Sequence, residues 1–189
     1  MKTRILEILD NSLAVKRASI ESHVEILEKC AQSMAECLTS GHKILIFGNG
    51  GSAADAQHIA AEFVNRFKIE RPPLAAIALT TDTSILTSIG NDYDFNEIFS
   101  KQIKAIGKKY DIAWGISTSG NSANVVDALK VAKEMELTTV GMTGEGGGKT
   151  SEYSDMLFAV NSNVTARIQE THITMGHILC DLVDRILFP

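Results

Sequence analysis

The chain has 189 residues, of which 44% are hydrophobic and 22% are charged, a globular composition that excludes a largely disordered protein. The formal net charge of −5 and the lack of a long basic run argue against nucleic-acid binding through a broad basic surface. No apolar stretch approaches the roughly 20 residues that span a bilayer, and the first residues lack the features of a signal peptide. Three cysteines are too few for a disulfide framework. We therefore expect one domain, residues 1–189, in a cytoplasmic protein with no membrane partner.

The first forty residues are predicted to be helical. Ile5, Leu9 and Leu13 follow one another in steps of four. A heptad-like apolar seam then runs through Ile20, Val24, Leu27, Ala31, Met34 and Leu38. Gly41 is typical of a helix stop. Such a seam can cover the domain's own sheet, pack against another subunit, or do both, and we expect residues 1–41 to serve in oligomerisation.

From residue 43 onward, short apolar runs alternate with helical stretches. Buried parallel strands are predicted over residues 43–47, 74–79, 111–116, 139–142 and 156–160. Helices are predicted over residues 53–67, 85–90, 95–106, from 123 to about 136, and 166–187, with Ser52 as the N-cap of the first. This order predicts an α/β fold with an open parallel sheet and helices on both faces.

Two strand–loop–helix units echo each other along the chain. Residues 48–52 (GNGGS) follow one strand, and residues 117–122 (STSGNS) follow another. Ligands of open α/β sheets bind beyond the carboxyl ends of strands, so the two loops predict one shared crevice. The second loop has four hydroxyls in six residues at a helix start, where N–H groups and the helix dipole can hold a phosphate without Lys or Arg. A plain capping turn needs only one hydroxyl, so phosphate binding is favoured.

Two near-matches to nucleotide motifs are not favoured. Gly48, Gly50 and Ala53 nearly fit a dinucleotide fingerprint, but the acidic residue that should follow roughly 20 positions later, at the end of the next strand, is missing. Residues 143–150 (TGEGGGKT) nearly fit a Walker A loop, but Thr143 replaces the first glycine and a strand follows in place of a helix. We therefore expect a flexible surface loop at residues 143–150 and no nucleotide cofactor.

Two polar groups on apolar helices are candidates for chemistry. His58 and Glu62 lie four residues apart, hence on one helix face, where they can ligate a divalent metal or place a general base. A surface pair is the common alternative, but this helix is largely apolar. The C-terminal helix carries several polar side chains among apolar ones, which indicates a polar site: Gln169, Glu170, His172 and His177.

These residues resemble the SIS (sugar isomerase) domain family, and most closely its sedoheptulose 7-phosphate isomerase group. The matching segments are GNGGSAADAQHIAAEF (48–63), RPPLAAIALTTDTSILTSIGNDYDFNEIFSKQ (71–102), GISTSGNSANV (115–125) and RIQETHITMGH (167–177). The STSGNS loop is general to SIS domains. The Gly-rich loop with its later His and Glu, and the RIQE segment with its later His, are more specific. Together with the helical N-terminus, the resemblance covers essentially the whole chain.

The resemblance implies a ketose–aldose isomerase that converts sedoheptulose 7-phosphate into D-glycero-D-manno-heptose 7-phosphate through an enediol, the first step of bacterial heptose (lipopolysaccharide precursor) biosynthesis. It implies Glu62 as general base and His177 as general acid. The residues that it implies for substrate binding are Asn49, Gly50, Gly51, Ser52, Glu62, Asn91, Asp92, Ser117, Thr118, Ser119, Ser122 and Gln169. It also implies a homotetramer and one Zn²⁺ per subunit on His58, Glu62, Gln169 and His177.

Two interpretations without catalysis stay open. Residues 179–189 look like the end of a SIS protein that binds the bacterial replication initiator. That group lacks acid and base residues where this chain has Glu62 and His177, so their presence favours the enzyme. A sugar-phosphate-binding regulator is the other interpretation, and it predicts phosphate binding that is insensitive to Glu62→Gln.

Overall fold

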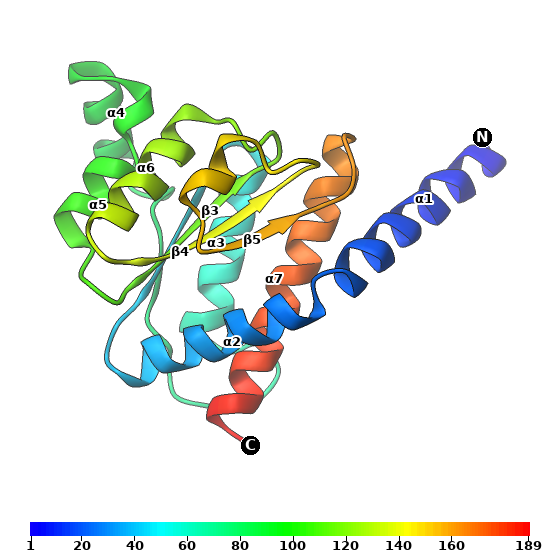
Figure 1. The fold of residues 1–189 in the computed structure, drawn as a ribbon, viewed down its shortest axis with the longest axis horizontal. Helices are drawn as coiled ribbons and strands as arrows, with labels where there is room; N and C mark the ends of the chain where they lie inside the picture. The colour runs from blue at the N-terminus through cyan, green and yellow to red at the C-terminus, as the bar shows by residue number, and fades with distance from the viewer.

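A computed structural model describes all of residues 1–189 (Figure 1). The elements follow in the order α1 (Lys2–Glu21), α2 (Val24–Thr39), β1 (Ile44–Gly48), α3 (Gly51–Val64), β2 (Ala76–Ala78), α4 (Thr83–Asp92), the 3-10 helix η1 (Phe95–Glu97), α5 (Ser100–Ile106), β3 (Ile112–Ser117), α6 (Ala123–Glu134), β4 (Thr138–Thr143), the 3-10 helix η2 (Gly148–Tyr153), β5 (Met156–Ala159) and α7 (Thr165–Leu187). The predicted alternation of strands and helices is confirmed.

The five strands form one parallel sheet in the order β2-β1-β3-β4-β5. In the register of β1 and β3, Gly48 pairs with Ile116, so both strands end at the same edge of the sheet. The loops that leave these two strands therefore begin side by side, as their sequence echo predicted. The predicted α/β class with an open parallel sheet is confirmed.

Helices cover both faces of the sheet (Figure 1). Successive strand residues point to opposite faces. Ile44 and Ile46 of β1 accordingly join the apolar cluster beneath α2, α3 and α7. Leu45 and Phe47 join the cluster formed with α5 and α6. The two layers account for the continuous apolar strand runs, because a strand covered on both faces has no solvated side.

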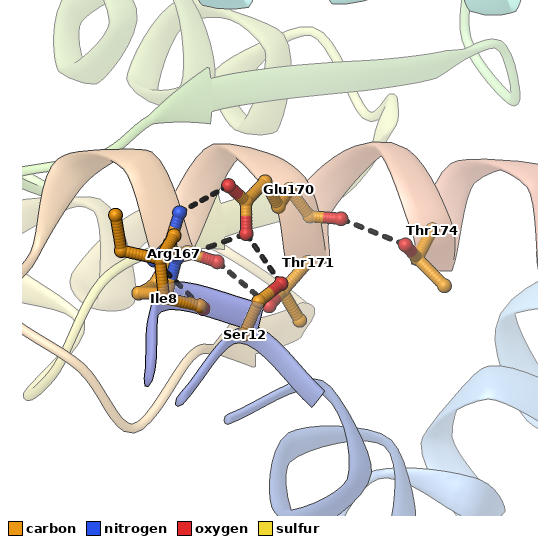
Figure 2. A network of polar contacts seen from close by, with 6 residues as sticks. All are labelled: Ile8, Ser12, Arg167, Glu170, Thr171 and Thr174. Atoms are coloured by element: carbon orange, nitrogen blue, oxygen red, sulfur yellow. Dashed lines mark hydrogen bonds and ion pairs between the residues drawn. The ribbon is translucent and has the colours of Figure 1, made fainter. Parts of the chain in front are cut away.

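Helix α1 extends away from the body of the molecule (Figure 1). Only Ser12 and Ser19 of this helix are buried. Figure 2 shows its joint with α7, where the Ser12 hydroxyl donates to a Glu170 carboxylate oxygen at 2.6 Å. Arg167 holds the same carboxylate and also donates to the Ile8 carbonyl oxygen. The joint ties the N-terminal helix to the first turns of α7.

Several predicted boundaries were wrong for local reasons. Ser52 is not an N-cap: α3 begins at Gly51, and the cap position is Gly50, whose φ of +55° suits glycine and turns the chain sharply into the helix. The N-terminal helical stretch breaks between Glu21 and Val24. Helix α4 runs past Gly90 to Asp92, and the predicted helix over residues 95–106 divides into η1 and α5.

The three cysteines are free and buried. Cys30 and Cys37 lie in α2 and Cys180 in α7. Burial raises the pKa of Cys37 and Cys180 to about 12, so both are protonated thiols at neutral pH. None of the helices combines the length and the apolar character that crossing a bilayer requires.

Candidate active site

The two loops at the carboxyl ends of β1 and β3 are joined by a pair of amide side chains. Asn49 Nδ2 donates to Asn124 Oδ1 at 2.8 Å, and Asn124 Nδ2 donates back to Asn49 Oδ1 at 3.0 Å. Asn49 follows β1, whereas Asn124 lies in the first turn of α6 after β3. The reciprocal pair fixes the spacing of the loops and so brings the Gly-rich loop and the Ser-rich loop to one site.

The Ser-rich loop gathers its hydroxyls at the start of α6. Ser117 Oγ lies 3.0 Å from Ser122 Oγ and 3.4 Å from Ser119 Oγ. Thr118 and Ser119 line a cavity of about 330 Å³ whose other lining residues are Glu145, Ser162, Asn163, Thr165 and Ile168. Three converging hydroxyls at the positive end of a 12-residue helix can bind an anion such as a phosphate.

Two histidines and a glutamate meet where α3 packs on α7. His58 Nε2 lies 3.2 Å from Glu62 Oε1 and 2.9 Å from His177 Nε2, and a ligand atom from each of the three residues lies within 4.8 Å of the others. The Phe67 ring stacks on the His177 ring at 5.3 Å. Burial lowers the pKa of His177, and the His58 ring adds to the shift. The helix pair predicted locally, His58 and Glu62, thus gains its third member from a segment more than a hundred residues away.

The packing of α3 on α7 depends on Arg71, which the sequence analysis missed. Its side chain is 1% exposed, and Nε donates to Asp184 Oδ1 of α7 at 2.9 Å. The guanidinium also donates to the carbonyl oxygens of Glu62 and Phe63 at the end of α3. A cation that satisfies the last carbonyls of a helix is a recognised C-terminal signal, but the sequence alone does not show which basic residue does so.

The three converging side chains are a suitable donor set for a metal ion. Two imidazole nitrogens and one carboxylate match catalytic zinc sites that keep a further position open for water or substrate. His58 is half exposed and Glu62 is 22% exposed, so the cluster is reachable from solvent. On donor chemistry and convergence, the residues fit a zinc ion.

Gln169 and His177 occupy different places along the uninterrupted helix α7. A residue spacing of eight corresponds to roughly 12 Å along a helix, so Gln169 lies well away from the His–Glu–His cluster in its own chain. Its amide packs directly on Gly51: a Cβ at Gly51 would lie 2.5 Å from Gln169 Nε2. Gln169 therefore flanks the Gly-rich loop, and its role as a zinc ligand stays a prediction.

The other polar residues of α7 serve the fold. His172 is fully buried, its Nε2 donates to the Thr143 carbonyl oxygen at 2.9 Å, and burial lowers its pKa to about 4, so the ring is neutral at pH 7. Glu170 faces α1 and Arg167, as Figure 2 shows. Of the four polar residues that the sequence singled out on this helix, only Gln169 and His177 face the candidate site.

The remaining predicted substrate contacts lie in two places. Asn49 and Gly50 line a small cavity of about 120 Å³ together with Leu86 of α4 and with Ile98 and Phe99, which follow η1, and Ser52 is buried. Asn91 and Asp92 are exposed at the end of α4, where the Asn91 amide donates to Asp92 Oδ1 at 2.8 Å. Helix α4 lies at the opposite side of the molecule from α7 in Figure 1. The structure thus brings the two loops, α3 and α7 together, and keeps Asn91 and Asp92 apart from the His–Glu–His cluster within one chain.

Comparison with known proteins agrees with this arrangement. The sequence profile of the SIS domain matches residues 8–144. A phosphoheptose isomerase of Nitratidesulfovibrio vulgaris is 61% identical over 84% of this chain and 76% of its own length. A phosphoheptose isomerase of Thermodesulfovibrio yellowstonii is 53% identical over 100% of this chain and 94% of its own length. The solved phosphoheptose isomerase from Neisseria gonorrhoeae superposes with a TM-score of 0.91 at 46% identity, covering 97% of this chain and 98% of that one.

Proposed function

The chain belongs to the SIS domain family, and from that membership we propose that it is a phosphoheptose isomerase, which converts sedoheptulose 7-phosphate into D-glycero-D-manno-heptose 7-phosphate. The observation that carries the proposal is the meeting of Glu62 and His177 on the packed helices α3 and α7. Isomerisation needs a base and an acid at one site. We propose that the enzyme acts in the cytoplasm, at the first step of heptose biosynthesis for lipopolysaccharide.

The reaction moves the carbonyl of the ketose from C2 to C1. Glu62 removes a proton from C1 while His177 donates a proton to the oxygen on C2, which forms an enediol. The enediol then gives its C1 hydroxyl proton to His177 and takes a proton at C2 from Glu62, which yields the aldose and restores both side chains. Each positioned transfer contributes about 10²–10⁴ to the rate. Because burial lowers the pKa of His177, its neutral ring has one N–H to donate and one nitrogen lone pair to accept.

We propose that the Ser-rich loop anchors the phosphate of the substrate through Ser117, Thr118, Ser119 and Ser122. The converging hydroxyls and the start of α6 support this role. The sugar then contacts the Gly-rich loop and Gln169, with Asn91 and Asp92 as further proposed contacts. An anchor remote from the reacting carbons orients them toward Glu62 and His177 without taking part in the proton transfers.

The direct test of the activity is NMR of the protein mixed with sedoheptulose 7-phosphate in D₂O. Appearance of the aldose, with deuterium entering the sugar at the carbon that receives a proton, is the expected result. A SIS protein that binds the replication initiator without catalysis predicts neither. Absence of both, with and without added Zn²⁺, would contradict the isomerase, and a pull-down with the initiator would then test the alternative.

We propose that His58, Glu62 and His177 hold one Zn²⁺ per subunit, with Gln169 as a further proposed ligand. The convergence of two imidazole nitrogens and a carboxylate supports the first three. When bound, zinc supplies a Lewis acid that can polarise the sugar carbonyl. Of the three converging residues, His58 is the one outside the proton transfers, so it is the residue to change when metal binding is measured apart from chemistry.

His58→Gln is expected to weaken Zn²⁺ binding by more than the roughly 10–100-fold that loss of an outer partner of a metal site costs, because a direct ligand is removed. Isothermal titration of the metal-free protein with Zn²⁺ measures this without reference to activity. His42→Gln is the matched control, because His42 lies before β1 beside Asp111, away from the cluster. Equal Zn²⁺ affinity for the two variants would refute the site.

We also propose a homotetramer in which residues 1–41 make subunit contacts. Helix α1 exposes a stripe of large apolar side chains, at Ile5, Leu9 and Leu13, which are 63%, 50% and 56% exposed. Contiguous exposed apolar side chains on a helix that leaves the body of the domain mark an interaction surface. In a closed symmetric oligomer, every subunit buries this same surface against a neighbouring subunit.

Leu9→Glu is expected to lower the mass in solution from four times the 20.5 kDa of one chain to a smaller species. A carboxylate in the middle of an apolar contact is desolvated without a partner. Light scattering coupled to size exclusion measures the mass. Ala14→Glu, also exposed but on the far side of α1 from this stripe, is the control that should leave the mass unchanged. A tetramer in both variants would remove α1 from the proposed interface.

A further inference from the structure

The loop of residues 144–150 packs on the Ser-rich loop. It was expected to be a flexible surface segment, and that expectation was wrong for its inner side, where Gly144, Gly147 and Thr150 are buried. The Gly144 N–H donates to the Thr118 carbonyl oxygen at 3.0 Å. The backbone N–H and the hydroxyl of Thr150 both donate to the Gly120 carbonyl oxygen at 2.9 Å. These contacts connect the turn after β4 to the turn after β3.

Three glycines let the two loops interlock without intervening side chains. Gly120 has a φ of +65°, and a Cβ there would lie 2.2 Å from the Gly147 carbonyl oxygen. Gly148 has a φ of +54°, and a Cβ there would lie 2.7 Å from the Gly120 carbonyl oxygen. Left-handed backbone and close approach both require glycine here. The glycine run that resembles a nucleotide-binding loop thus has a packing function.

The Thr150 hydroxyl is connected to Ser119 through a single peptide group. The carbonyl of Gly120 and the N–H of Asn121 belong to one planar trans peptide and point in opposite directions. Thr150 holds the carbonyl on the inner side, and the Asn121 N–H accordingly points to Ser119 Oγ at 3.1 Å. Thr150 itself is 0% exposed, so it cannot reach a bound substrate.

We propose that Thr150 is a positioning residue for sugar-phosphate binding: by holding the Gly120–Asn121 peptide, it sets the direction of the Ser119 hydroxyl. The inference rests on the proposed role of the Ser-rich loop as the phosphate anchor. It assigns loop 144–150 as the support of that anchor. A residue that supports the phosphate anchor stabilises the bound substrate and the transition state equally. Its loss therefore raises KM and leaves kcat nearly constant.

Thr150→Ala and Thr150→Ser form the test pair, because they differ only by the hydroxyl. Thr150→Ala is expected to raise the KM for sedoheptulose 7-phosphate roughly three- to tenfold, the range for one lost hydrogen bond, with kcat within about twofold of the parent. Thr150→Ser is expected to keep the parent KM. Thr150→Val, which keeps the shape and lacks the hydroxyl, should behave like Thr150→Ala. Thermal melting identifies folded variants, and any one hydroxyl-free variant that folds is sufficient.

Ser119→Ala distinguishes the proposed role of Thr150 from the proposed role of the Ser-rich loop as phosphate anchor. A raised KM in Ser119→Ala with an unchanged KM in Thr150→Ala and Thr150→Val would overturn the role of Thr150 and leave the phosphate anchor standing. An unchanged KM in Ser119→Ala would overturn the anchor and the role of Thr150 with it. A parallel rise of KM in Thr150→Ala and Thr150→Ser would also overturn the proposal, because the lost methyl group would then be the cause.

Discussion

Glu62→Gln is expected to lower the turnover of sedoheptulose 7-phosphate by on the order of 10²–10⁴, the contribution of one positioned proton transfer. The substitution removes the charge and keeps the shape. The contacts that hold this residue in α3 are made by its backbone, whose carbonyl oxygen accepts from Arg71 at 2.9 Å. The variant should therefore fold like the parent, with the amide unable to take a proton from C1.

The measurement is deuterium incorporation from D₂O into the sugar, followed by NMR together with aldose formation. Glu70→Gln is the matched control, because Glu70 is an exposed carboxylate paired with Arg66 beyond the end of α3. Since Glu62 is also a proposed zinc ligand, both variants are assayed across a range of Zn²⁺. Activity restored by excess zinc would assign the loss to metal binding, and full activity at any zinc concentration would remove Glu62 as the base.

Arg71→Met is expected to lower the free energy of unfolding by about 3–5 kcal/mol, the cost of breaking a buried ion pair by removing one partner. Asp184 is 7% exposed at its side chain and would be left as a buried carboxylate without its cation. The carbonyl oxygens of Glu62 and Phe63 would lose their donors as well. Unpaired polar groups of this kind are among the few causes of large single-residue losses of stability.

Urea unfolding followed by circular dichroism measures this difference. Arg66→Met is the matched control: Arg66 pairs with Glu70, both side chains are more than half exposed, and such a pair contributes at most about 1 kcal/mol. A second substitution, Asp184→Leu, added to Arg71→Met should recover part of the loss by removing the stranded charge. Equal costs for Arg71→Met and Arg66→Met would show that the buried pair does not hold α3 on α7.

The strand residues and the residues of α3 explain why the fold could be predicted more fully than the site. The runs at β1 and β3 are apolar on successive residues because each strand is covered on both faces, and that pattern is visible in the sequence. His58 and Glu62 are neighbours by helix geometry alone. Boundaries were less certain: at α3 the left-handed conformation of Gly50 moved the start of the helix, which no side-chain preference at Ser52 reveals.

The roles of residues whose contact partners lie far away in the sequence were not predicted. Arg71 and Asp184 are 113 positions apart, and two other basic residues, Arg66 and Lys68, stand near the end of α3 in the sequence. Thr150 lies in a glycine run whose composition is typical of an exposed loop, and its burial follows only from the docking of that loop on Gly120. His172 and Glu170 were candidates for a polar site, and their contacts with Thr143 and α1 assign them to the fold.

The sequence by itself determined the α/β class, the order of the strands and helices along the chain, the two loops at the carboxyl ends of β1 and β3, and the family. Each of these depends on periodicity or on spacing within a short segment, which local backbone geometry converts directly into structure. The family resemblance pointed to His177 as the partner of His58 and Glu62, and the tertiary structure brings the three side chains together. Only the tertiary structure decided that Arg71 and Thr150 support the site. Which side chains meet depends on how α7 is rotated about its axis and on how closely loop 144–150 packs on the Ser-rich loop. Such packing is set by the whole core rather than by any one segment.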